Sequence, residues 1–190
     1  MPVTHAYDTV HELALEQHGV FTAEQATKLG VNPKSIVAMA ARGRRLERIS
    51  FGLYRDLGAP ETHWTEYMKA ALWPQGVIGV LSHETALDLM NLSDANPALM
   101  HVTVPKKHRV RRRTPPAGVV LHHADLPEED VGSIEGLPVT TAARTIRDCA
   151  ATNIGPALLR QAIDDATRGG WLRPTETEAL RAEFENSDML

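Results

Sequence analysis

The apolar residues of the N-terminal third recur at helical spacing, and capping residues divide them into separate helices. A first amphipathic helix is predicted over residues 7–17, where apolar positions lie three and four residues apart. Thr22 and Gln25 have the spacing of a capping box, which predicts the start of a short second helix that ends at Gly30. Asn32 is then placed to cap a third helix.

This third helix begins with Pro33, whose missing N–H costs nothing at a first helical position, and Gly43 is expected to end it. Two short helices joined by a tight turn form a helix-turn-helix. The buried stripe of the third helix is expected to consist of Ile36, Val37, Ala40 and Ala41. The opposite face and the arginines that follow it are predicted to contact DNA through Lys34, Ser35, Met39, Arg42, Arg44, Arg45 and Arg48.

A β-hairpin is predicted directly after the third helix. Residues 46–49 and 53–55 are strand-like and flank a turn at Ser50–Gly52, and residues 20–21 form an extended segment that pairs with it. A hairpin in this place is a wing, so the pattern favours a winged helix-turn-helix whose arginines meet the phosphate backbone. The alternative is a two-helix scaffold with a solvated basic turn.

A second unit is expected after a linker at Gly58–Pro60, which divides the chain into residues 1–58 and 59–190. Strands come first in this unit and helices last, so the predicted fold class is α+β. Strands are expected at residues 77–81, 100–104, 119–122, 131–134 and 137–139. Helices are expected at residues 62–72, 83–91, 142–150, 156–167 and 174–185.

Composition and charge narrow the class of protein. No apolar run approaches 18 residues and no secretory signal pattern is present, so a cytoplasmic protein without a membrane partner is expected. The lone cysteine, Cys149, excludes an internal disulfide and a cysteine-based zinc site. The net charge of −4 conceals a gradient, because residues 114–190 carry thirteen Asp/Glu against six Lys/Arg. A more basic N-terminal part suits a protein that binds DNA at one end.

A basic run at residues 106–113 has six Lys/Arg in eight positions: Lys106, Lys107, Arg109, Arg111, Arg112 and Arg113. Because the run lies between two predicted strands, a hairpin loop is expected to present it outward. Such a loop would meet phosphates or an acidic partner protein. The alternative is an ordinary solvated loop.

The sequence shows no convincing active site, so no enzymatic activity, cofactor or metal ion is expected. His122 and His123 invite a metal-site interpretation, but adjacent residues on a strand point to opposite faces. Ser82 and His83 are interpreted as the cap of a helix rather than as part of a catalytic triad. No glycine-rich phosphate loop is present, and Cys149 is expected in the core.

Six motifs taken together resemble the AbiEi family of antitoxins and transcriptional regulators of type IV toxin–antitoxin pairs. They lie at Gly19–Thr22, Leu29–Val31, Gly52–Arg55, Leu81–Leu87, Val102–Pro105 and Gly136–Thr145. The resemblance implies a winged helix-turn-helix that binds inverted repeats in operator DNA upstream of its own operon. It also implies an α+β domain required for antitoxicity and a cognate toxin of the nucleotidyltransferase type. Some relatives carry an added nuclease-like domain, for which this chain is expected to be too short.

Two functions therefore compete. The first is a DNA-binding antitoxin and autorepressor, which either holds its toxin directly or counteracts it without contact. The second is a stand-alone winged-helix regulator whose second domain senses a ligand or a partner. The sequence does not give the operator sequence, the oligomeric state on DNA or the target of the toxin.

Overall fold

The structure, a computed structural model, describes residues 3–41, 45–109 and 114–185. The chain divides into two compact units, with the main division after Gly79. Residues 109 and 135–137 group with the first unit. The expected boundary at Gly58–Pro60 is therefore too early. Ala59 is buried, and Thr65 Oγ1 donates a hydrogen bond of 2.9 Å to the carbonyl of His18, so the chain beyond Pro60 still belongs to the first unit.

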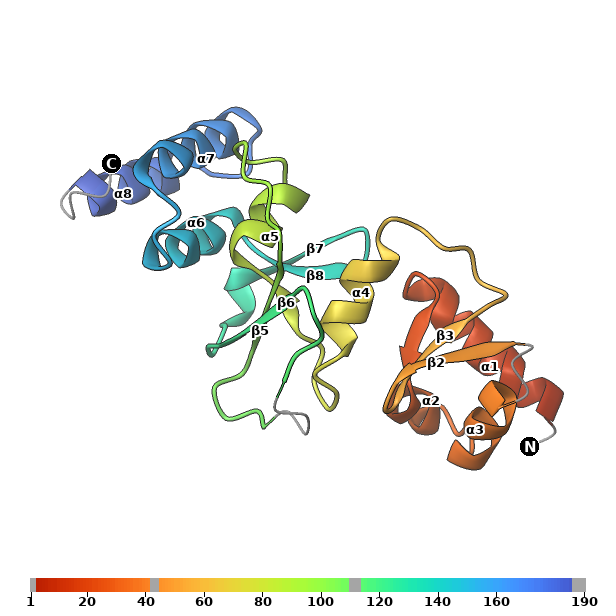
Figure 1. Cartoon of the computed structure of the whole chain (residues 1–190). Helices are drawn as coiled ribbons and strands as arrows, with labels where there is room; N and C mark the ends of the chain where they lie inside the picture. The colour runs from red at the N-terminus through yellow and green to blue at the C-terminus, as the bar shows by residue number, and fades with distance from the viewer. Residues whose placement is uncertain (1–2, 42–44, 110–113, 186–190) are drawn as a thin grey trace. The chain divides into compact units, whose positions relative to one another are not determined.

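Four helices of the first unit lie where helices are predicted (Figure 1): α1 Val3–Glu16, α2 Ala23–Lys28, α3 Pro33–Ala41 and α4 Thr65–Leu72. α1 begins at residue 3 rather than 7, and α4 at residue 65 rather than 62. The capping box is present, because the Thr22 N–H donates to Gln25 Oε1 at 2.8 Å and the Gln25 N–H donates to Thr22 Oγ1 at 3.1 Å. Asn32 Oδ1 accepts the N–H of Lys34 at 2.9 Å, as an N-cap does. The predicted stop at Gly43 lies outside the described residues.

A three-stranded antiparallel sheet completes the first unit. It contains β1 Val20–Thr22, β2 Leu46–Ser50 and β3 Leu53–Asp56, in the order β1-β3-β2. Gly52 has a φ of 71° in the β2–β3 turn, a conformation that side chains with a Cβ rarely adopt. The predicted wing-like hairpin and its pairing with the segment after α1 are confirmed.

The core of the first unit joins the helices to the sheet. Phe21 stacks on Tyr54 with ring centroids 5.9 Å apart, and side chains of α1, α2 and α3 pack around them. The fully or nearly fully buried members are Ala6, Val10, Ala14, Phe21, Ala26, Val31, Ile36, Met39, Leu46 and Tyr54. Burial of side chains from α1, α2, α3 and the three strands fixes the orientation of α3 relative to the hairpin.

The second unit is built on a mixed five-stranded sheet in the order β6-β5-β4-β8-β7 (Figure 1). Its strands are β4 Val80–Leu81, β5 Met100–Val104, β6 Val119–His123, β7 Val131–Ile134 and β8 Leu137–Thr140. β4 is shorter than the five residues predicted, because Val77, Ile78 and Gly79 do not join the sheet. The mixed α+β class predicted from the sequence is confirmed.

The connection between β5 and β6 corrects one expectation. The two strands are parallel, with Met100 opposite Val119 and Val104 opposite His123. Because parallel neighbours require a crossover, the basic run cannot lie on a hairpin loop. It lies instead on the segment that returns the chain from one end of β5 to the start of β6.

The helices of the second unit are α5 His83–Leu89, a 3₁₀ turn at Glu128–Asp130, α6 Ala142–Ala151, α7 Pro156–Arg168 and α8 Pro174–Glu185. α5 packs on α6, α6 on α7, and α7 on α8. The buried positions of α7 are Leu159, Ala162, Ile163 and Ala166, which is the spacing of one apolar stripe. Among the described helices, none is both long and apolar enough to cross a membrane.

Candidate functional site

The solvent-facing side of α3 is the first part of the candidate site. Ile36 and Met39 are buried, whereas Val37 is 53% exposed. The expectation that Met39 faces outward and Val37 inward is therefore wrong. The reason is the helical period: Met39, three residues after Ile36, lies about 60° from it around the axis, whereas Val37 lies about 100° away. The exposed positions of α3 are Pro33, Lys34, Val37, Ala38 and Ala41, and Ser35 is half-buried beside them. Ala41, expected in the buried stripe, therefore also faces outward.

The hairpin places two of the predicted arginines in solvent. Arg45 lies over the ring of Tyr7, with Cζ 4.4 Å from the ring centroid. Arg48 lies over Phe51 at 5.7 Å, and its Nε donates to the carbonyl of Ser50 at 3.3 Å. These contacts restrain the guanidinium groups, while both residues stay exposed, which favours binding to phosphate. Arg42 and Arg44 lie outside the described residues.

A buried carboxylate, which sequence reasoning missed, ties the hairpin to α1. Asp56 at the end of β3 is fully buried and accepts hydrogen bonds from Tyr7 Oη at 3.0 Å, His11 Nδ1 at 2.5 Å and the N–H of Gly58 at 3.0 Å. Burial and the hydrogen bond to Asp56 raise the pKa of Tyr7. Since Tyr7 also supports Arg45, Asp56 positions the hairpin and one of its cations together.

The basic run is described only in part. Lys106, Lys107 and Arg109 are exposed, and the N–H of Lys106 donates to Asp125 Oδ1 at 3.0 Å, which fixes the start of the segment. Arg111, Arg112 and Arg113 lie outside the described residues. The described cations thus remain candidates for a phosphate or acidic partner, on a crossover rather than on a hairpin.

The structure separates His122 from His123 and brings His122 together with two other histidines. His123 is exposed, whereas His122 meets His83 and His101, and the ligand atoms of these three lie within 4.8 Å of one another. Burial lowers the pKa of His83 to about 3 and that of His122 to about 4, and nearby histidines add to both shifts. Burial also lowers the pKa of His101. The three rings are therefore uncharged at neutral pH.

Ser82 occupies the N-cap position of α5, as expected, but it does not cap the helix through its side chain. Its hydroxyl makes no capping hydrogen bond and instead lies 2.9 Å from His83 Nδ1 and 2.7 Å from Thr103 Oγ1. Adjacent residues converge here because His83 has a φ of 54°, which turns its ring back toward Ser82. Ser82 is fully buried, so this pair does not present a nucleophile to solvent.

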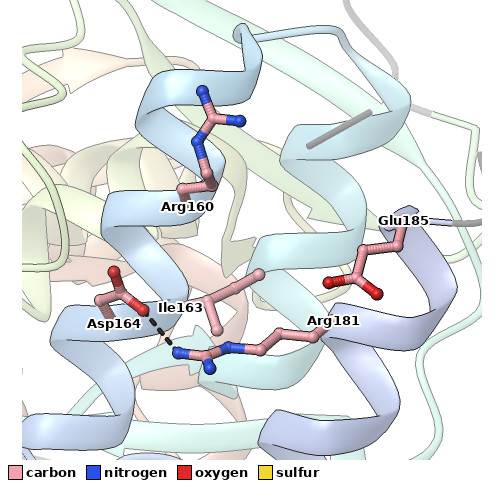
Figure 2. A pocket seen from close by; sticks show the side chains of 5 residues that line it. All are labelled: Arg160, Ile163, Asp164, Arg181 and Glu185. Carbon is pink, nitrogen blue, oxygen red and sulfur yellow. Dashed lines mark hydrogen bonds and ion pairs between the residues drawn. The ribbon is translucent and has the colours of Figure 1, made fainter. Parts of the chain in front are cut away.

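An open cavity of about 430 Å³ lies between α7 and α8 (Figure 2). Figure 2 shows that Arg160, Ile163 and Asp164 come from α7, and Arg181 and Glu185 from α8. Arg181 Nη2 donates to Asp164 Oδ1 at 2.7 Å, so two of the four charged groups already satisfy each other. All four charged residues are exposed, which makes the cavity a solvated groove between helices.

Elsewhere in this unit Cys149 is buried as expected, and burial raises the pKa of its thiol.

Comparison with known proteins gives two findings. Residues 8–55 match the family model described as transcriptional regulator, AbiEi antitoxin. A solved structure, the crystal structure of the RV2827C protein from Mycobacterium tuberculosis, is similar with 16% sequence identity and a TM-score of 0.42, covering 94% of this chain and 81% of that chain. This likeness is too distant to carry any conclusion. Among curated proteins none matches the chain.

The matched segment runs from α1 to the end of the hairpin, which is the part of the first unit that carries the exposed face of α3. The first three of the six motifs that resemble the family thus lie within a segment that the family model matches independently. Residues 8–55 of the chain are therefore similar to the AbiEi antitoxin family of transcriptional regulators.

Proposed function

We propose that the protein is an antitoxin that represses its own operon by binding inverted repeats in promoter DNA through α3 and the β2–β3 hairpin. The observation that carries this proposal is the exposed face of α3, which lies within the segment matched by the AbiEi family. Lys34 in the first turn of α3 suits a guanine edge or a phosphate, and Val37 suits the methyl group of thymine.

The hairpin supplies the sequence-independent part of this interface. Arg45 and Arg48 are exposed cations next to α3 in the chain, and each one that neutralises a phosphate releases counterions. Such contacts fix the register of a protein on the duplex, while side chains of α3 read the bases. Inverted repeats require two copies of the reading helix, so binding by two protomers is part of the proposal.

The experiment is a gel-shift titration and footprint on the chain's own promoter, with the full-length protein. Lys34→Ala and Val37→Ala should weaken operator binding and leave the melting temperature nearly unchanged. Lys69→Ala is the matched control, because it removes a lysine of the same unit that lies on α4 and pairs with Glu66. Equal losses for Lys34→Ala and Lys69→Ala would contradict the assignment of α3 as the reading helix.

The second half of the proposal concerns antitoxicity. A nucleotidyltransferase toxin uses carboxylates to hold its metal ion and nucleotide, and an exposed basic segment complements such a surface. Lys106, Lys107 and Arg109 are the described residues that fit this role. The toxin is counteracted either by direct contact or by a functional route, and co-purification of the two proteins distinguishes these.

We propose that this action needs binding and no catalysis. The buried positions of Ser82 and Cys149 support this view, because neither side chain is open to a substrate. A stand-alone regulator without a toxin is the outcome to expect if co-expression with a neighbouring nucleotidyltransferase gives no rescue of growth.

A further inference from the structure

We propose that His83, His101 and His122 form a binding site for one divalent transition-metal ion, with Zn²⁺ as the best-fitting occupant. One ligand atom from each of these residues lies within 4.8 Å of the other two. The site belongs to the second unit, so this proposal is independent of DNA binding by α3.

Strand register explains why the three histidines meet. On parallel strands β5 and β6 Thr103 lies opposite His122, and His101, two residues from Thr103, shares its face of the sheet. Ser82 follows β4 and its N–H donates to the carbonyl of His101 at 3.0 Å, which brings the next residue, His83, to the same place. The buried Val102 and Val104 point to the other face.

One distance within the cluster is close to that of a metal centre. His101 Nδ1 lies 3.0 Å from His122 Nε2. Two nitrogens bound to one tetrahedral Zn²⁺ at about 2.0–2.1 Å are separated by about 3.3 Å. The His83 ring stacks on the His122 ring with centroids 3.7 Å apart, so binding requires the His122 ring to tilt away from that of His83. Rotation about χ2 of histidine is soft, which makes this adjustment inexpensive.

His83 is held in a form suited to a ligand. Its Nδ1 hydrogen-bonds the hydroxyl of Ser82, which in turn hydrogen-bonds Thr103, and both hydroxyls are buried. A hydroxyl partner on Nδ1 leaves Nε2 to bind a metal and fixes the orientation of the ring. His83 also keeps a left-handed φ of 54° although it is not glycine. Unusual backbone of this kind gathers at functional sites.

The charges around the cluster permit a cation. Glu84, the neighbour of His83 on α5, exerts a negative field on His101. Arg144, the cation that acts on His83, is already paired with Asp130 at 3.1 Å and Asp148 at 2.9 Å. His83 is 7% exposed, whereas His101 and His122 are partly open to solvent, so an ion can enter on their side.

The chemistry of the ligands selects the class of ion. Three imidazoles suit Zn²⁺, Co²⁺, Ni²⁺ and Cu²⁺, whereas Mg²⁺ and Ca²⁺ prefer oxygen ligands. Three protein ligands leave a fourth position for water or for a group of a partner molecule. A bound ion would link α5, β5 and β6, and thereby stabilise the folded second unit.

The test uses the full chain purified without a histidine tag and stripped of metal by a chelator. Titration with Zn²⁺ should show one tight equivalent and a rise in melting temperature, whereas Mg²⁺ should produce neither. Co²⁺ should give the intense visible absorption of a four- or five-coordinate centre. His101→Ala and His122→Ala should each weaken Zn²⁺ binding by more than about 100-fold, since even indirect partners of metal ligands are worth 10–100-fold.

His123→Ala is the matched control, because it removes the adjacent, exposed histidine from the same strand. Circular dichroism of the metal-free variants establishes that each is folded. Because His101 and His122 are partly exposed, their substitution should disturb the fold less than substitution of the buried His83, and the test does not need a variant of His83. Equal loss of affinity in the His123→Ala and His122→Ala variants, or a Zn²⁺ titration without a tight equivalent, would overturn the proposal.

Discussion

The two units of this chain place their polar groups in opposite ways. The first unit exposes Lys34, Arg45 and Arg48 and buries one carboxylate, Asp56, that holds the hairpin beneath them. The second unit turns three histidines, His83, His101 and His122, toward one another and fixes His83 through buried hydroxyls. Exposed cations suit a large anionic partner such as DNA, whereas inward nitrogens suit one small ion. The difference between the units indicates that exposed charged groups favour a macromolecular partner, whereas polar groups that converge inside the fold favour a small ligand.

The largest expected effect comes from the buried carboxylate of the first unit. Asp56→Ala removes the acceptor of three hydrogen bonds and leaves Tyr7 and His11 without their partner, which should cost about 3–5 kcal/mol of unfolding free energy. Urea denaturation measures it. Asp8→Ala, which removes an exposed carboxylate from α1, the helix of Tyr7 and His11, should stay within about 0.5 kcal/mol. A similar loss of unfolding free energy in the two variants would show that Asp56 does not hold the hairpin in position.

The next effect separates the two faces of α3. Ile36→Ala should cost about 2–4 kcal/mol because it opens a cavity in the core, whereas Val37→Ala should change stability by less than about 0.5 kcal/mol. Thermal melts give the first quantity, and operator titrations should show that Val37→Ala is the variant with a direct binding defect. If Val37→Ala were the more destabilising change, the assignment of faces would be reversed.

In the second unit the hydroxyl network offers a smaller effect. Ser82→Ala leaves His83 Nδ1 and Thr103 Oγ1 without a shared partner, at a cost of about 1–3 kcal/mol. The same change should weaken Zn²⁺ binding by about 10–100-fold, because it frees the ring of a proposed ligand. Ser133→Ala on β7, an exposed hydroxyl, is the control for both measurements. Unchanged Zn²⁺ affinity in Ser82→Ala would show that the network does not orient His83.

Loss of a hairpin arginine should affect DNA binding without affecting stability. Arg48→Ala should reduce the slope of log K against log salt by about one unit if it removes one phosphate contact. Since Arg48 is exposed, the free energy of unfolding should change by less than about 0.5 kcal/mol. Gel shifts at several salt concentrations measure the slope. An unaltered slope would show that Arg48 makes no contact with a DNA phosphate.

The smallest effect on stability is expected for the basic segment. Replacing Lys106, Lys107 and Arg109 together by Ser should leave the fold intact, because all three side chains are exposed. Growth rescue against the toxin should weaken more than operator binding does. Full rescue together with lost operator binding would assign the segment to DNA instead.

Local signals in the sequence were sufficient for most of the first unit. The capping box of Thr22 with Gln25 and the cap at Asn32 involve residues three or fewer positions apart, so no distant contact is needed to recognise them. The predicted faces of Val37 and Met39 were wrong because Ala and Val residues lie on both sides of the buried face of α3, so its angular position is poorly defined by the sequence. A count from Ile36 by three and four residues would have favoured Met39 and Ala40.

The sequence by itself determined the α+β class, the order of nearly all elements and the hairpin after α3, because each depends on neighbouring residues. Only the tertiary structure decided the parallel pairing of β5 with β6 and the meeting of His83, His101 and His122. These residues are separated by about twenty positions along the chain, and the register of β5 with β6 and the hydrogen bond from Ser82 to His101 bring them together. The burial of Asp56 against α1 was decided in the same way. Contacts between distant segments arise from packing of the whole unit, which no local pattern encodes.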